Sequence, residues 1–292
     1  MAVKEIKTIK KRSQFVSVWH RYKKNKLAMF GLILLAIMLL IAIFADLLVD
    51  YQSDVVEQHM SERLQGISSE HWLGTDQYGR DIFSRIIYGT RISLFIGLAS
   101  VCISVTAGTI IGAIAGYYGG KVDNILMRIM DMFLAIPQML MAIAIVAALG
   151  SGITNLLIAL SISATPGFSR IVRSSIMSIK EQDFVEAAVA YGATDRHIIL
   201  KHIIPNAIGP IIVQATLDIA TAILTIASLS FIGLGIQSPT PEWGTILSEG
   251  KAQMREFPHL IVSPGIAIIL AVMALNLIGD GLRDALDPRM KN

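Results

Sequence analysis

The uncharged run Leu27-Ala-Met-Phe-Gly-Leu-Ile-Leu-Leu-Ala-Ile-Met-Leu-Leu-Ile-Ala-Ile-Phe-Ala45 decides the fold class of this 292-residue chain. A helix needs about 20 apolar residues to cross the hydrocarbon core of a bilayer, with about 17 as a lower limit. The run is longer than the roughly 7–15 apolar residues of a cleavable signal peptide, and no small-x-small cleavage site follows it. We therefore expect it to remain as a membrane anchor.

The rest of the chain is equally apolar. It is 53% hydrophobic and only 16% charged, with a mean hydropathy of +0.61, whereas soluble domains are about 45–50% apolar and 25% charged. Because lipid accepts only helices or closed barrels as spanning structures, the sequence predicts an all-α membrane protein. Six segments are long enough to span, with a tight hairpin at Gly150-Ser-Gly152 between the third and fourth: 27–46, 92–116, 129–149, 153–169, 207–236 and 259–279.

The positive charges are distributed unevenly between the two sides of this predicted bundle. Residues 1–26 alone carry nine Lys and Arg, and one side holds 19 of the 25 in the chain. Cytosolic segments of membrane proteins carry the excess of Lys and Arg. We therefore expect both termini and the loop at 170–205 to lie in the cytosol. The basic arm 1–26 either only enforces this orientation or also binds anionic lipid.

Several enzyme classes have no support in the sequence. The Gly-Lys pairs at 120–121 and 250–251 lack the following Ser or Thr of an ATP-binding P-loop. The chain has no His-Glu-x-x-His and no Gly-x-Ser-x-Gly motif, and its six histidines are scattered. The single cysteine, Cys102, lies in an apolar run and reads as a packing residue. With these enzyme classes unsupported, the sequence indicates a transport or scaffolding role.

The loop between the fourth and fifth segments contains the stretch Glu186-Ala-Ala-Val-Ala-Tyr-Gly192. A short helix is predicted from Asp183, a candidate cap, to Tyr191, with Gly192 as its left-handed end. An apolar stripe at helical spacing is formed by Phe184, Ala187, Ala188 and Tyr191.

A second short helix is predicted after Gly192. Thr194 or Asp195 can cap it, it runs through His202, and Pro205 marks its exit into the next membrane segment. Small residues flanked by aromatic side chains are typical of a docking surface. The alternative is a hairpin that packs only on its own bundle, and the residues alone do not decide between the two.

The spacing of Glu-Ala-Ala, three residues, Gly, nine residues and a hydrophobic-x-hydrophobic-Pro ending resembles the signature of binding-protein-dependent ABC importer permeases. The resemblance implies the type I importer permease fold, in which this loop forms a coupling helix that sits in a groove of an ATPase subunit. It departs at His202 and Ile204, where the signature has isoleucine and leucine. The coupling residues that it implies are Phe184, Glu186, Ala187, Ala188, Tyr191 and Gly192.

A second match lies outside the loop. The stretch Leu73-Gly-Thr-Asp76-Gln-Tyr-Gly-Arg80-Asp81-Ile-Phe-Ser84-Arg85 and its continuation to Leu94 resemble the C-type permeases for dipeptides, oligopeptides and nickel. Pro241-Glu-Trp-Gly244 and the ending Gly279 to Pro288 are similar to the same branch. The match divides the chain into 1–90, with the basic arm, anchor and external segment, and 91–292, the core permease domain with the coupling loop at about 170–205.

The resemblance also implies partners. These are a second permease subunit that forms a heterodimer with this chain, two cytosolic ATPases that hold ATP and Mg, and an extracytoplasmic solute-binding protein. It implies no cofactor in this chain, no nucleic-acid partner, and a place in the inner membrane of a bacterial or archaeal cell. The expected cargo is a di- or oligopeptide, with nickel or a metal chelate as the alternative. An ion-coupled secondary transporter is the alternative from another class, although it would need a coupling-ion site and internal repeats.

The segment from Gly79 to Arg91 has an amphipathic pattern. Ile82, Phe83, Ile86 and Ile87 share one helical face, and Arg80, Asp81, Ser84 and Arg85 share the other. This pattern predicts a helix that rests at the outer membrane surface. An anchoring strut is favoured over a gate.

Asp218, Asp131 and Asn276 are polar residues inside predicted spans. Asp218 is about 18 Å into the fifth segment at 1.5 Å per residue, near the middle of the bilayer. It is either a translocation-pathway residue or a structural group that accepts hydrogen bonds from Thr216, Thr221 or a neighbouring chain. Asp131 is expected to pair with Arg128 on its own helix. Asn276 reads as a packing residue.

Overall fold

The computed structural model describes residues 14–286 and is helical throughout that range, apart from loops and one isolated bridge between Thr75 and Asp81. The residues before Gln14 in the basic arm, and the Asp287-Pro288 end of the C-terminal motif, lie outside the described range. The α-helices in chain order are α1 (Gln14–Tyr22), α2 (Lys26–Ile43), α3 (Ala45–Leu48), α4 (Ile82–Tyr118), α5 (Gly120–Leu134), α6 (Gln138–Leu149), α7 (Ile153–Lys180), α8 (Asp183–Ala190), α9 (Asp195–His197), α10 (Ile204–Phe231), α11 (Trp243–Gly250) and α12 (His259–Leu286).

Within residues 14–286, five helical stretches are long and apolar enough to cross a membrane: α2, α4, α7, α12 and the continuous run Asp195–Phe231 that contains α10. The pair α5 and α6 makes a sixth candidate, but the two helices are bent by 83°. The span predicted over 129–149 therefore corresponds to a broken pair of helices and not to one continuous helix. The break falls at Pro137, because proline removes a backbone donor and disfavours helical geometry in the residue before it.

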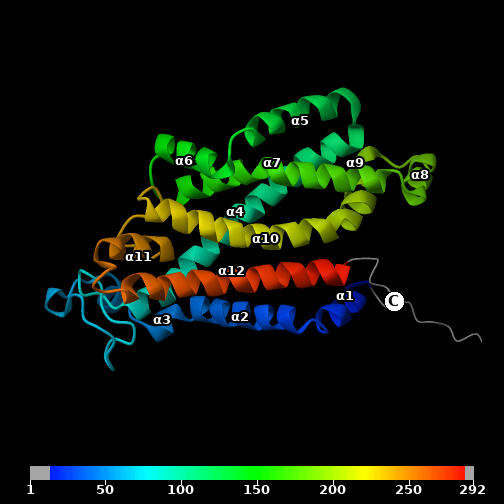
Figure 1. The fold of residues 1–292 in the computed structure, drawn as a ribbon. Helices are drawn as coiled ribbons and strands as arrows, with labels where there is room; N and C mark the ends of the chain where they lie inside the picture. Colours follow the sequence, from blue (N-terminus) through cyan, green and yellow to red (C-terminus); the bar gives the residue numbers. More distant parts are fainter. Residues whose placement is uncertain (1–13, 287–292) are drawn as a thin grey trace, which may run out of the picture.

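The short helices gather at the two ends of the bundle. α1, α8 and the end of α12 lie at one end, whereas α3 and α11 lie at the other (Figure 1). The sequence predicts that both termini and the loop at 170–205 lie on the cytosolic side. The position of α1, α8 and the end of α12 at one end of the bundle agrees with that prediction. The predicted hairpin between the third and fourth segments is confirmed, since α6 ends at Leu149 and α7 begins at Ile153.

α4 and α7 pack with their backbones close together. Gly108, Gly112 and Gly116 recur every four residues along α4 and face α7, and a Cβ atom added at Gly112 would lie 2.5 Å from the carbonyl oxygen of Ser169. Membrane helices associate through such small residues because lipid provides no hydrophobic drive for their contact. Nearer the middle of the pair, Ser161 donates a hydrogen bond to the carbonyl oxygen of Ser100 at 3.2 Å.

α11 is a short helix held tightly between longer ones. Its first residue, Trp243, is fully buried and donates from Nε1 to the carbonyl oxygen of Ile86 at 3.2 Å. Glu242 caps the helix by accepting from the backbone of Gly244 at 2.9 Å, and it also accepts from Ser93 at 3.2 Å. The apolar core around Trp243 includes residues of α2, α4, α10 and α12. α11 therefore joins several spans at this end of the bundle.

The polar face of the Gly79 to Arg91 segment is buried, which contradicts the prediction of a helix resting at the membrane surface. The side chains of Arg80 and Arg85 are 0% exposed. Arg80 Nη2 lies 2.7 Å from Asp76 Oδ2 and 2.8 Å from Glu249 Oε2, and Arg85 Nη1 lies 2.6 Å from the same Asp76 oxygen. The four charges compensate one another, which is the condition for burying them. Ile82 instead begins α4, which continues directly into the span.

Within this quartet of Asp76, Arg80, Arg85 and Glu249, the two arginines favour the charged form of Glu249. Burial alone would raise the pKa of Glu249, but the charges of Arg85 and Arg80 outweigh it and lower the pKa overall. A carboxylate with a lowered pKa stabilises the folded state above its unfolded pKa, and this contribution is lost as the pH falls through the folded pKa. The quartet thus fixes the external segment before α4 against α11.

Candidate functional site

The predicted helix after Asp183 is present as α8, at the far end of the molecule (Figure 1). Gln182, not Asp183, occupies the N-cap position. Gly192 follows the helix with φ +78°, in the left-handed region that glycine adopts most easily, and its N–H donates to the carbonyl oxygen of Val189 at 2.9 Å. A turn of this kind ends α8 sharply, as the sequence predicts.

α8 has one packed face and one open face. Val185 is buried together with Ile176, Ile179 and Ile198, so the loop rests on the cytosolic end of its own bundle. The open face carries the other apolar side chains: Tyr191 is 92% exposed and Phe184 38% exposed. Of the six residues assigned to coupling, Ala188 alone is half-buried, and Phe184, Glu186, Ala187, Tyr191 and Gly192 are exposed.

The second half of the loop differs from its prediction. Thr194 caps α9 by accepting from the backbone of His197 at 3.4 Å. Pro205 does not mark an exit, since the helix continues from Asp195 to Phe231 without a stop. A π-helical stretch, Ile198–Ile203, precedes α10, and the N–H of Ile204 bonds to the carbonyl oxygen of Ile199. Pro205, which has no N–H to donate, therefore lies in the first turn of α10, where proline is tolerated.

Asp195, the other residue predicted as a possible cap of this helix, makes a tertiary contact instead. Its Oδ1 accepts from the hydroxyl of Tyr117, at the end of α4, at 2.8 Å. Lys180, the last residue of α7, donates to the carbonyl oxygen of Tyr117 at 2.5 Å and lies 5.4 Å from the centre of its ring. The base of the loop is thereby tied to α4. Sequence reasoning missed this contact because its partners are 63 and 78 residues apart.

Two arginines of α7 connect the loop to α5. Arg173 pairs with Asp123 through Nε and Nη2, both at 2.5 Å, and Arg170 pairs with Asp131 at 2.5 Å. The predicted pairing of Asp131 with Arg128 is therefore wrong. Asp131 instead accepts a charge-assisted hydrogen bond from the guanidinium of Arg170 on the neighbouring helix α7. His202, where the signature is broken, is half-buried, with its ring 5.4 Å from that of His197.

Asp218 is half-buried in α10 and has a partner on its own helix. Oδ1 accepts from Gln214 Nε2 at 2.9 Å. The hydroxyls of Thr216 and Thr221 donate to the carbonyl oxygens of Ile212 and Leu217, so the predicted bonds from these threonines to Asp218 are not made. A small pocket adjoins the carboxylate, and its border includes Ser100 and Ser104 of α4 and Gln138 of α6. Nothing in the sequence pattern brings these residues together with Asp218.

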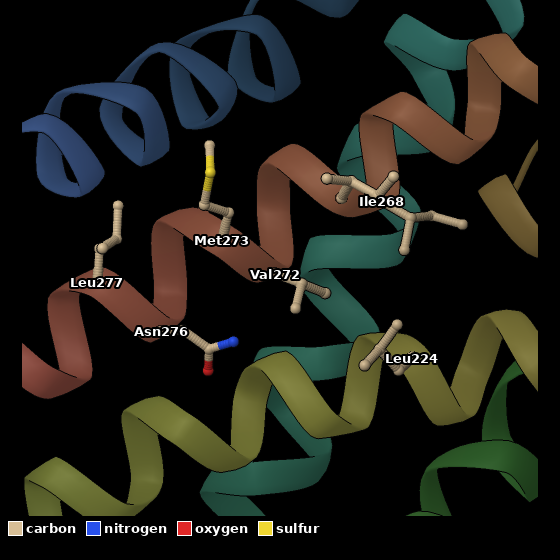
Figure 2. Close-up of a pocket in the computed structure, with 7 residues that line it drawn as sticks. Leu224, Ile268, Val272, Met273, Asn276 and Leu277 are labelled. Atoms are coloured by element: carbon tan, nitrogen blue, oxygen red, sulfur yellow. The ribbon is translucent and has the colours of Figure 1, made fainter.

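A wider apolar groove runs between α10 and α12. Its volume is about 450 Å³. Asn276 is exposed and projects from α12 toward α10, with Val272 beside it and Leu224 across the groove (Figure 2). Asn276 therefore borders an open groove and is not packed inside this chain, contrary to the expectation from sequence. The lining residues are Leu224, Ile268, Ile269, Val272, Met273, Asn276 and Leu277.

The model of the binding-protein-dependent transport system inner membrane component matches residues 108–292, which include α8 and Asp218. The chain belongs to this family. The model of the N-terminal transmembrane domain of oligopeptide transport permease C matches residues 13–66. This permease is thus of the C type, a multi-pass protein of the inner membrane and a non-catalytic subunit of an ABC importer. It has no cofactor of its own, and it works with partner ATPase subunits that hold ATP and with a binding protein.

Curated relatives align with the permease over nearly their full length. It is 51% identical over 281 residues to the dipeptide transport system permease protein DppC of Alkalihalophilus pseudofirmus, which covers 95% of this chain and 92% of the relative. It is 44% identical over 280 residues to the glutathione transport system permease protein GsiD of Escherichia coli O157:H7, which covers 96% and 92% respectively.

Solved structures show the same fold. An inward-facing conformation of the MetNI methionine ABC transporter matches 70% of this chain and 97% of that chain, with a TM-score of 0.59 and 18% sequence identity. A second inward-facing crystal form of the same transporter matches with a TM-score of 0.53 and 20% identity. These structural matches confirm the type I importer permease fold that the Glu-Ala-Ala loop implied.

Proposed function

We propose that this permease carries di- or oligopeptides, delivered to its outer side by an extracytoplasmic solute-binding protein. The support comes from its relatives: the dipeptide permease DppC is 51% identical over 95% of the chain. The GsiD relatives carry the name of glutathione, which is itself a small peptide. Nickel or a metal chelate is the alternative cargo that the same branch of permeases offers.

The permease acts in this proposal as one half of a heterodimer. A second permease subunit completes the path, and two cytosolic ATPases attach below. Residues 1–90 supply the anchor and the external segment, and residues 91–292 form the core that moves. Asp218, halfway along α10, is proposed to face the path of the cargo, since intramembrane carboxylates usually mark substrate or ion pathways.

The open face of α8 is the observation that carries the coupling role. Its residues Phe184, Glu186, Ala187 and Tyr191 are exposed, with Tyr191 at 92%. The opposite face is packed through Val185, and the loop is tied to α4 through Tyr117. A push on α8 is therefore transmitted to α4 and α7 as a rigid-body movement. ATP-driven closure of the ATPases tilts the bundle from inward-facing to outward-facing, and hydrolysis resets it.

Uptake into proteoliposomes tests the proposed function. The permease is reconstituted with its second permease subunit, the two ATPases and the binding protein, and radiolabelled dipeptide is supplied outside. We expect uptake that requires ATP and the ATPase subunits and that persists when a protonophore removes the proton gradient. Uptake that continues without the ATPases and collapses with the proton gradient would show a secondary transporter. Uptake of nickel but not of peptide would assign the other cargo.

A further inference from the structure

A polar pocket lies beside Asp218 at the midpoint of α10. In the range Ile204–Phe231, 14 residues precede Asp218 and 13 follow it. The pocket has polar side chains from α4 (Ser100 and Ser104), from the first residue of α6 (Gln138) and from α10 itself (Thr221). A charged carboxylate at this depth is costly, and such residues persist where they pair with a partner or serve a function.

The hydroxyls around the pocket have already used their protons. Ser100 donates to the carbonyl oxygen of Gly97 at 3.0 Å, Ser104 to that of Ser100 at 3.0 Å, and Thr221 to that of Leu217 at 3.3 Å. A hydroxyl has one proton to donate and two lone pairs that accept. With its proton engaged, each of these oxygens offers a guest only acceptor sites. Together with the carboxylate of Asp218, they favour a guest that is positively charged and rich in donors.

The size of the pocket limits that guest to a small group. Its volume is about 20 Å³, and about 10–15 Å³ on the same kind of measure holds one water molecule. A primary ammonium group has a single heavy atom, carries three N–H donors and one positive charge, and is about the size of water. Because Asp218 is half-buried, a group that enters the pocket can reach its carboxylate.

We propose that the Asp218 pocket binds the terminal ammonium group of the peptide cargo at the halfway point of its passage. The inference rests on the proposed peptide substrate. The α-amino group of a peptide has a pKa of about 7.7–8.0, so it is largely protonated at neutral pH. Asp218 supplies the opposite charge, Ser100, Ser104 and Thr221 supply acceptors, and Gln138, placed by the break between α5 and α6, supplies its amide oxygen.

The variant Asp218→Asn tests the charge without changing the shape. Asparagine is nearly isosteric and keeps an oxygen that accepts from Gln214, so a purely structural role of Asp218 as an acceptor survives. In proteoliposomes with the whole complex and saturating loaded binding protein, we expect peptide moved per ATP hydrolysed to fall at least about tenfold, because one partner of a buried charge pair is lost. The thermal melting of the complex reports on its folding and should stay at the wild-type value.

Two further variants test a smaller effect at the pocket and provide a matched control. Thr221→Val removes one acceptor from the pocket, and we expect a loss of roughly threefold, of the size of one neutral hydrogen bond. Thr216→Val is matched to it: Thr216 lies on the same helix and donates to Ile212, but it does not border the pocket. Its ratio of peptide to ATP should stay at the wild-type value.

The possible outcomes separate the inference from the proposed function. If wild-type vesicles import no peptide at all, the proposed function fails. If they import peptide and Asp218→Asn imports it equally well per ATP, the ammonium site is refuted and the importer stands. Wild-type uptake is also measured with all alkali cations replaced by choline. If wild-type uptake in choline falls to the level of the Asp218→Asn variant, the pocket binds a metal cation and the proposal is overturned.

Discussion

Gly192 holds the end of α8 in a conformation that other residues adopt only with strain. Its φ of +78° is left-handed, and a Cβ atom added there would meet no other group within 4 Å. The requirement therefore lies in the backbone, not in the space around it. A left-handed residue with a side chain costs about 1–2 kcal/mol, and β-branched residues cost most. Tyr191, immediately before the turn, depends on this geometry for its direction.

Replacement of Gly192 by valine should uncouple the permease without preventing its insertion. We expect the stimulation of ATP hydrolysis by cargo-loaded binding protein to fall roughly 5–30-fold, which corresponds to the strain of about 1–2 kcal/mol. Gly192→Asn is the matched control, because asparagine tolerates the left-handed region, and it should keep most of the stimulation. Equal stimulation in Gly192→Val and wild type would remove Gly192 from the coupling element.

Among the elements, the interface of α4 and α7 depends on the glycines of α4. A methyl group at Gly112 would lie 2.5 Å from the carbonyl oxygen of Ser169, so the two helices would have to separate. We expect Gly112→Ala to lower the thermal stability of the purified complex by an amount typical of overpacking, about 1–3 kcal/mol. Gly167→Ala, on α7 where nothing lies within 4 Å, is the control and should be neutral. Equal melting temperatures for Gly112→Ala and Gly167→Ala would contradict this view of the interface.

The spans and α8 were predictable because their signals are local. Length and hydropathy locate each apolar segment, and the left-handed stop at Gly192 and the apolar spacing locate α8. The failures arise where a distant partner changes the outcome. The helical pattern places Arg85 on a polar face that is typical of a protein surface. In the structure it is buried and pairs with Glu249, 164 positions later in the chain. Asp131 has a suitable local partner in Arg128 but pairs with Arg170 on another helix.

The candidate site was predictable in part for the same reason. The exposure of Phe184 and Tyr191 follows from a helix whose other face carries Val185 toward the bundle, although the sequence left docking and self-packing open. In the structure one face of α8 packs on the bundle and the other is exposed, and docking of the exposed face is our proposal. The pocket at Asp218 could not be predicted, since Ser100, Gln138 and Asp218 come from three helices whose packing no periodicity describes.

At the scale of the whole molecule, the two ends of the permease are built differently. At the α11 end, the buried quartet and Trp243 lock the external segment, α4 and α11 together. At the opposite end, α8 projects beyond the bundle (Figure 1) and packs on it through Val185, and the base of the loop is tied to α4 through Tyr117. A rigid frame with one protruding contact suits a subunit that receives force from outside itself. The central claim is that α8 receives this force from an ATPase.

Site-specific photo-cross-linking at Tyr191 tests that claim most directly. A photoreactive phenylalanine analogue replaces Tyr191 in the complete complex, and a second complex carries it at Ile67, which is 70% exposed in the external segment. We predict that Tyr191 cross-links to an ATPase subunit, with a yield that changes when ATP is added, and that Ile67 does not. A complex that hydrolyses ATP and imports peptide while position 191 gives no cross-link to an ATPase would contradict the account.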